Sequence, residues 1–109
     1  MILACTSTVV AYFSGLGGPD VDAFERGINE EKLSIPPVVV LELLSDPGLD
    51  RTAITNLKRI PLAAISERFW ERAGILRSKL LAKGHKAKVA DAIIAQCSLD
   101  HDAILATRD

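Results

Sequence analysis

MILACTSTVVAYFSG, residues 1–15, is the stretch that decides the fold of this chain. Residues 1–4 are apolar and then give way to polar residues, a pattern that predicts a short buried strand. Apolar residues resume at helical spacing, and Ser7 is a good N-cap for a helix over residues 8–14. Open α/β sheets keep their functional groups just beyond the carboxyl ends of their strands. Cys5 stands at that position, so its role is the first question that the sequence raises.

The rest of the chain alternates predicted strands and helices. Strands are expected at residues 33–35, 60–64 and 103–106. Helices are expected at residues 21–28, 38–44, 51–57, 66–83 and 89–99. Asp20 and Asp50 are the predicted N-caps of the first and third of these helices, and Gly84 ends the helix that begins at Ser66. This alternation predicts an α/β fold in which helices cover both faces of a parallel sheet. Right-handed crossovers put the carboxyl ends of all strands along one edge, where Cys5 and Asp109 should both lie.

Length and composition indicate one folded domain over residues 1–109, with 49% hydrophobic and 25% charged residues. The net charge is −1, so any contact with nucleic acid must come from a local basic patch. The cysteines, Cys5 and Cys97, are far apart and form neither a disulfide framework nor a metal-binding spacing. The sequence shows no signal peptide and no span of membrane length. These features predict a cytoplasmic protein in a reduced compartment.

Three carboxylates occur in apolar surroundings or at a strand end. Glu42 lies in VVVLELL, Asp91 in VADAIIA, and Asp109 follows AILATR. Each has an ordinary alternative, which is a solvent-facing position for Glu42, a first-turn helix acid for Asp91 and a turn residue for Asp109. Clustered carboxylates repel one another unless cations neutralise them, and oxygen ligands suit Mg²⁺ or Mn²⁺. If the topology brings the three together, they predict a metal site for phosphoryl chemistry.

Three segments, in order, carry a resemblance to a known family. MILACTSTVVAYFSG, IPPVVVLELLSDP and KVADAIIAQCSLDHDAILATRD resemble a PIN domain of the VapC toxin type over nearly the whole chain. The resemblance implies a Rossmann-like, three-layer α/β/α fold with a short parallel sheet. It also implies a ribonuclease that depends on Mg²⁺ or Mn²⁺ and acts as the toxin of a toxin–antitoxin pair.

Carried over residue by residue, the resemblance also assigns the site. It implies that Glu42, Asp91 and Asp109 are catalytic metal ligands and that Thr6 supports the site. The family's first acid falls on Cys5, a soft sulfur donor at the place of a hard oxygen ligand, so the nuclease is expected to be weakened or inactive. The family usually continues beyond the TRD segment, which implies that the domain is truncated at its C-terminal end.

The expected partners are RNA and a cognate antitoxin. Lys86, Lys88 and Arg108 lie beside the predicted acids in sequence and are candidates for contacting RNA, with a solvated surface as the ordinary alternative. By resemblance, the molecule is a homodimer that binds the antitoxin in a groove beside the active site. The competing hypotheses are a catalytically dead PIN-fold module that binds antitoxin or RNA, a phosphoreceiver-like domain, and a nucleophilic role for Cys5.

Overall fold

The computed structural model describes residues 1–108. In that part of the chain, a parallel sheet has the order β2-β1-β3, with strands β1 (Ile2–Ala4), β2 (Leu33–Ser34) and β3 (Ile104–Ala106). The central strand aligns Ile2 with Leu33 on one side and with Ile104 on the other. The first strand is therefore the middle of the sheet, and chain segments from both halves of the sequence pair with it.

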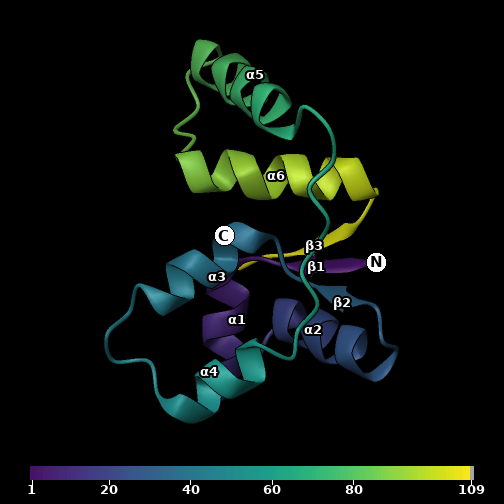
Figure 1. Ribbon diagram of the computed structural model, residues 1–109, viewed down its shortest axis with the longest axis vertical. Coiled ribbons are helices and arrows are strands. Elements are labelled where there is room, and N and C mark those ends of the chain that lie inside the picture. The colour runs from purple at the N-terminus through teal and green to yellow at the C-terminus, as the bar shows by residue number, and fades with distance from the viewer. Residues whose placement is uncertain (109) are drawn as a thin grey trace.

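Helices cover both faces of this sheet (Figure 1). Within the described residues they are α1 (Thr6–Phe13), α2 (Pro19–Asn29), α3 (Pro37–Leu44), α4 (Arg51–Leu57), α5 (Phe69–Ala82) and α6 (Val89–His101). In Figure 1, α1, α2 and α4 lie below the strands, whereas α6 lies above them with α5 stacked outside it. This arrangement confirms the predicted three-layer α/β/α fold. Among the described helices, none combines the length and the apolar character that a bilayer span requires.

The side chains of β1 alternate between two hydrophobic cores. Ile2 and Ala4 pack in one cluster with the fully buried Phe24 of α2, whereas Leu3 packs in the other with Phe69 of α5. Successive residues of a strand point to opposite faces, so a strand covered on both sides must be apolar throughout. This requirement explains the unbroken apolar run that opens the sequence.

Two predicted N-caps are wrong. Ser7 lies inside α1, whose N-cap is Cys5, and Asp20 lies inside α2, whose N-cap is Gly18. The Ser7 hydroxyl lies 2.9 Å from the Cys5 sulfur, and Asp20 accepts hydrogen bonds from other elements, so neither side chain caps its helix. By contrast, Asp50 accepts from the N–H of Ala53 at 2.7 Å and caps α4 as predicted.

The predicted edge strand over residues 60–64 is also absent as a strand. The segment makes one parallel bridge, in which Ile35 donates to the carbonyl of Pro61 at 3.0 Å and accepts from Ala63 at 2.9 Å. Proline has no N–H to extend such a ladder, which explains why pairing stops after this bridge. The helix expected from Ser66 begins instead at Phe69.

Candidate functional site

The carboxyl ends of β1 and β3 lie side by side. The N–H of Cys5 donates to the carbonyl of Ala106 at 3.1 Å, and the Cys5 thiol donates to the hydroxyl of Thr107 at 3.3 Å. Residue 5 is thus placed beside the exit of β3, more than one hundred positions away in sequence. This confirms the prediction that the strand ends meet at one edge of the sheet.

Cys5 occupies a polar niche at the start of α1. The residue is 6% exposed, and its sulfur lies 2.9 Å from the Ser7 hydroxyl and 3.6 Å from the Thr8 hydroxyl. Burial raises the pKa of the Cys5 thiol, but hydrogen bonds from Ser7, Thr107 and Thr8 outweigh it, so the pKa falls below its usual value of 9.0. The niche therefore favours a negatively charged group at position 5.

Glu42 reaches the same edge of the sheet from α3. The hydroxyl of Thr6, the residue after Cys5, donates to Oε1 of Glu42 at 2.5 Å. Both side chains are half-buried, and α3 packs directly against α1. The structure therefore joins Glu42 to Thr6, whereas the side chain of the preceding Cys5 contacts Ser7, Thr8 and Thr107.

A second polar network, which the sequence analysis missed, holds the exit of β3 in place. The Arg108 guanidinium donates to both carboxylate oxygens of Asp20, at 3.0 and 3.1 Å, and to the carbonyl of Gly17 at 2.8 Å. The fully buried Thr8 hydroxyl lies within hydrogen-bonding distance of Asp20 and of the Ala106 carbonyl. Arg108, predicted to contact RNA, is therefore bound by the protein itself. No sequence pattern pairs Asp20 with a residue 88 positions away.

Burial raises the pKa of the Asp20 carboxyl, but the Thr8 hydroxyl, the Val21 N–H and the Arg108 guanidinium together bring it below its usual value of 3.8. Asp20 is therefore a charged anchor that joins α1, α2 and the end of β3.

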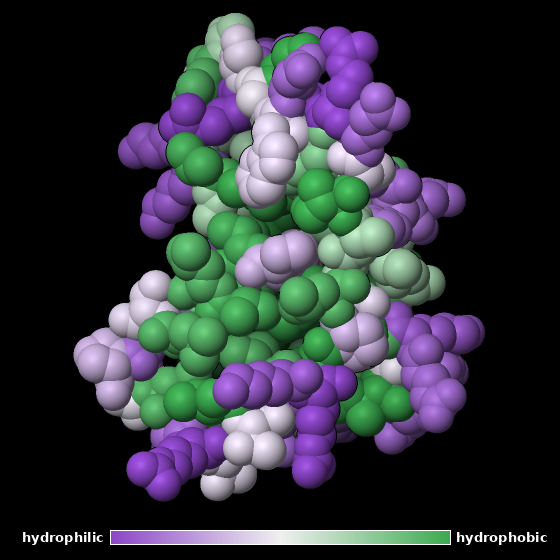
Figure 2. All heavy atoms as spheres, in the orientation of Figure 1, coloured by the Kyte–Doolittle hydropathy of each residue, from purple (hydrophilic) through white to green (hydrophobic). Residues whose placement is uncertain are grey.

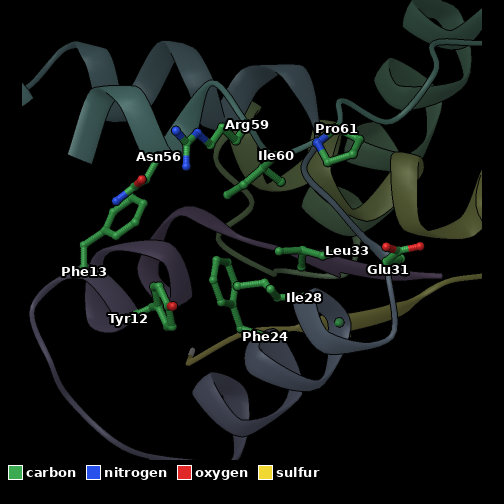
Figure 3. Close-up of a pocket in the computed structure, with 11 residues that line it drawn as sticks. Tyr12, Phe13, Phe24, Ile28, Glu31, Leu33, Asn56, Arg59, Ile60 and Pro61 are labelled. Atoms are coloured by element: carbon green, nitrogen blue, oxygen red, sulfur yellow. The ribbon is translucent and has the colours of Figure 1, made fainter. Parts of the chain in front are cut away.

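Two grooves open beside these elements. The smaller has a volume of about 270 Å³ and is lined by the carboxylates of Glu42, Asp46 and Asp50 together with Thr6 and apolar side chains. The larger, of about 460 Å³, is mainly apolar and is lined by α1, α2 and the end of α4 (Figure 3). Phe13 lines both grooves, so they are neighbours on the surface.

A family model described as the PIN domain matches residues 6–109. This chain belongs to the PIN domain family. PIN domains are generally nucleases, and they typically use divalent metal ions. Among curated proteins, none matches this PIN domain in sequence.

Solved structures share the fold of this PIN domain. A chain from the crystal structure of VapBC2 from Rickettsia felis, bound to a DNA fragment from its promoter, is 23% identical with a TM-score of 0.74. The match covers 100% of this chain and 89% of that one. A chain of FitAcB from Neisseria gonorrhoeae is 22% identical with a TM-score of 0.72, over 100% of this chain and 88% of that one.

Of the other two predicted acids of this PIN domain, the structure describes Asp91. Asp91 lies in the first turn of α6, a helix that packs against α3, and its side chain is exposed. Within residues 1–108, Asp91 makes no side-chain hydrogen bond or ion pair. Asp109 lies outside the described residues. The convergence of all four positions therefore stays a prediction.

The donor chemistry at this edge does not suit Mg²⁺ or Mn²⁺ by itself. Among residues 1–108, no group of three or more His, Cys, Asp or Glu side chains is placed to hold a metal ion. Mg²⁺ requires hard oxygen ligands in octahedral geometry, whereas Cys5 offers sulfur. Position 5 carries a thiol where the family resemblance expects an aspartate, and the Glu42 carboxylate is bound to the neighbouring Thr6.

Proposed function

We propose that this PIN domain is the toxin half of a toxin–antitoxin pair and descends from endoribonucleases that use Mg²⁺ or Mn²⁺. With cysteine at position 5, its cleavage of RNA is weak or absent. The single observation that carries this proposal is the place of Cys5, buried at the end of the central strand, beside Thr6 and Glu42, in a niche that favours a negative group.

The loss of activity follows from the chemistry of sulfur. A carboxylate at position 5 adds a full negative charge and two hard oxygens, whereas a thiol adds neither and prefers softer metals. The hydroxyl groups of Ser7, Thr8 and Thr107 surround position 5, and that of Ser7 can donate a hydrogen bond to an aspartate at the same place. The surroundings of the site are thus retained while its first ligand has changed.

The test compares the chain as it stands with Cys5→Asp and with Cys5→Asn, which has the shape of aspartate without its charge. A structured RNA is incubated with each protein in Mn²⁺ or in EDTA, and the cleavage products are separated on gels. We expect little cleavage by the unaltered chain, clear Mn²⁺-dependent cleavage by Cys5→Asp, and none by Cys5→Asn. Adding Glu42→Gln to Cys5→Asp should abolish the gain.

Two results would contradict the proposal. Cleavage by the unaltered chain at the rate of Cys5→Asp would mean that cysteine does not weaken the enzyme. Inactivity of both proteins, while an intact PIN nuclease cuts the same RNA, would favour the second candidate function. That candidate is a catalytically dead PIN-fold module that binds antitoxin or RNA, and the thiol at position 5 is the observation in its favour.

The proposed partner is a cognate antitoxin peptide seated along the two grooves. The apolar groove offers the half-buried rings of Tyr12 and Phe13 and the exposed Ile28, and the adjoining groove carries three carboxylates. Such a surface suits a peptide that presents apolar side chains followed by a basic one. The fold shared with a chain of VapBC2 is consistent with this partner.

We also propose a homodimer in a reduced, cytoplasmic compartment. Large apolar side chains are exposed on α3, where Leu41 is 67% and Leu44 47% exposed, and at the start of α6, where Val89 is 61% exposed. Apolar side chains gather across the middle of one face, over α3 and α6 (Figure 2). Both cysteines are free thiols, which suits a reducing compartment.

A further inference from the structure

The connection between α5 and α6 is the most positively charged part of the molecule. Residues 77–88, here called the basic tip, contain five of the chain's 13 lysines and arginines and none of its 14 acids. The four lysines of this basic tip are all exposed, and within residues 1–108 none of them forms an ion pair; they are Lys79, Lys83, Lys86 and Lys88. Their charges are therefore available to an external anion.

Helix stability does not account for these lysines. Lys79 and Lys83 are one turn apart at the end of α5, where the helix dipole favours a cation but where the two charges repel each other. Lys88 is the N-cap of α6, and the positive end of a helix disfavours a cation there. A positive side chain at a helix N-terminus instead strengthens a site that attracts anions.

The basic tip is an ordered structure. Nε of Arg77 donates to the carbonyl of Ala87 at 2.9 Å, which ties the end of the tip back to α5. The N–H groups of Gly84 and His85 donate to the carbonyls of Leu81 and Leu80, each at 3.0 Å. Gly84 has a φ of +83°, a conformation that glycine adopts without strain. The lysines are thus presented on a braced loop, which lowers the entropy cost of binding.

The tip leads directly to the candidate site. Lys88 lies three residues before Asp91, and α6 packs against α3, which carries Glu42. In Figure 1 the connection from α5 descends to the N-terminal end of α6, the helix whose first turn contains Asp91. An anion held by the lysines would therefore lie next to the predicted catalytic edge.

We infer that this basic tip binds the phosphate backbone of single-stranded RNA and guides it toward the site, an inference that rests on the proposed function. Lysines supply sequence-independent phosphate contacts. A protein partner would require apolar anchors, and lysine is depleted in such interfaces. Between Ala82 and Lys88 the chain offers only alanine and glycine besides the lysines and His85, and the exposed apolar side chains of Leu81 and Val89 lie at the two ends of this segment.

The test measures RNA binding without cleavage. Fluorescence anisotropy with a labelled single-stranded RNA, in EDTA and at 25–250 mM KCl, compares the unaltered chain with Lys83→Gln/Lys86→Gln. The matched control is Arg26→Gln/Lys58→Gln, which removes two exposed charges outside the tip and outside both grooves. Each lost phosphate contact should reduce the slope of log K against log salt by about 0.7. At 0.1 M salt this change corresponds to RNA binding that is roughly 5-fold weaker. The double variant should therefore bind about 25-fold more weakly, and the control should bind as the unaltered chain does.

Equal binding by the tip variant and the control would overturn the inference, as would failure of the unaltered chain to bind RNA. Competition by polyglutamate as effective as by unlabelled RNA would overturn it in favour of an acidic protein partner. A Cys5→Asp protein that remains inert while Lys83→Gln/Lys86→Gln loses RNA binding would refute the nuclease and leave the RNA-binding tip supported. Circular dichroism should give the same spectrum for the two lysine-tip and control variants as for the unaltered chain, because every side chain altered in them is exposed.

Discussion

Replacing Thr8 by valine tests whether the buried network at the end of β3 holds the candidate site together. Thr8 is 0% exposed, and its hydroxyl lies 3.0 Å from Oδ2 of Asp20 and 3.1 Å from the carbonyl of Ala106. Valine has nearly the same shape, so Thr8→Val removes the hydroxyl and leaves little cavity. The hydroxyl has a single proton, so one of the two acceptors loses a buried donor, while the Ala106 carbonyl keeps the N–H of Cys5.

The expected loss follows from the number of acceptors affected. Leaving a buried group without its partner costs about 1–3 kcal/mol, and Asp20 keeps the Arg108 guanidinium, so the lower part of that range applies. A loss of about 1–2 kcal/mol should lower the Tm by about 4–8 °C in a domain of this size. Thr52→Val, which makes the same change at an exposed position of α4, should stay within about 0.5 kcal/mol of the unaltered chain.

The loss should also depend on pH. The Thr8 hydroxyl helps to keep the pKa of Asp20 below 3.8, so the ionised carboxylate stabilises the fold above that pH. This part of the stability disappears as the pH falls through the folded-state pKa, where Asp20 becomes protonated with or without Thr8. Thermal unfolding followed by circular dichroism should therefore show a larger Tm difference at pH 7 than at pH 3. If Thr8→Val proves as stable as Thr52→Val at pH 7, the network does not hold the site.

Two further predictions concern metal ions and acid. Mn²⁺ should raise the Tm of Cys5→Asp but not the Tm of the unaltered chain, since a ligand at 100 times its Kd stabilises the folded state by about 2.7 kcal/mol. Scanning fluorimetry with and without EDTA measures the Tm of both proteins, and equal Tm shifts on adding Mn²⁺ would contradict this prediction. Hydrogen bonding from Arg72 lowers the pKa of Asp100 to about 2, so ionised Asp100 stabilises the fold above about pH 4 and stops doing so as the pH falls toward 2. Arg72→Gln should therefore lower the Tm more at pH 7 than near pH 2, where Asp100 is partly protonated and only the bonds from Arg72 to Ser66 and Glu67 are lost in full, and a loss that is the same at both pH values would refute this role.

The site was only partly predictable, because some of its contacts depend on sequence patterns and others do not. The position of Glu42 in an apolar helix indicated a special environment, and Thr6 does donate to its carboxylate. Cys5 was recognised from the end of a strand pattern, and the structure places it beside Ala106. Asp20, in contrast, was predicted to cap a helix, which is what its local sequence favours.

The sequence by itself determined the local elements. The apolar run at residues 1–4 indicated a strand buried on both faces, and helical spacing of apolar residues indicated the helices that pack against it. Only the tertiary structure decided which polar groups meet. Asp20 binds Arg108, and Cys5 donates to Thr107, since three-dimensional packing brings together residues that are separated by most of the chain. A hydrogen bond between distant residues leaves no periodic trace in sequence, whereas burial of a strand or helix face does.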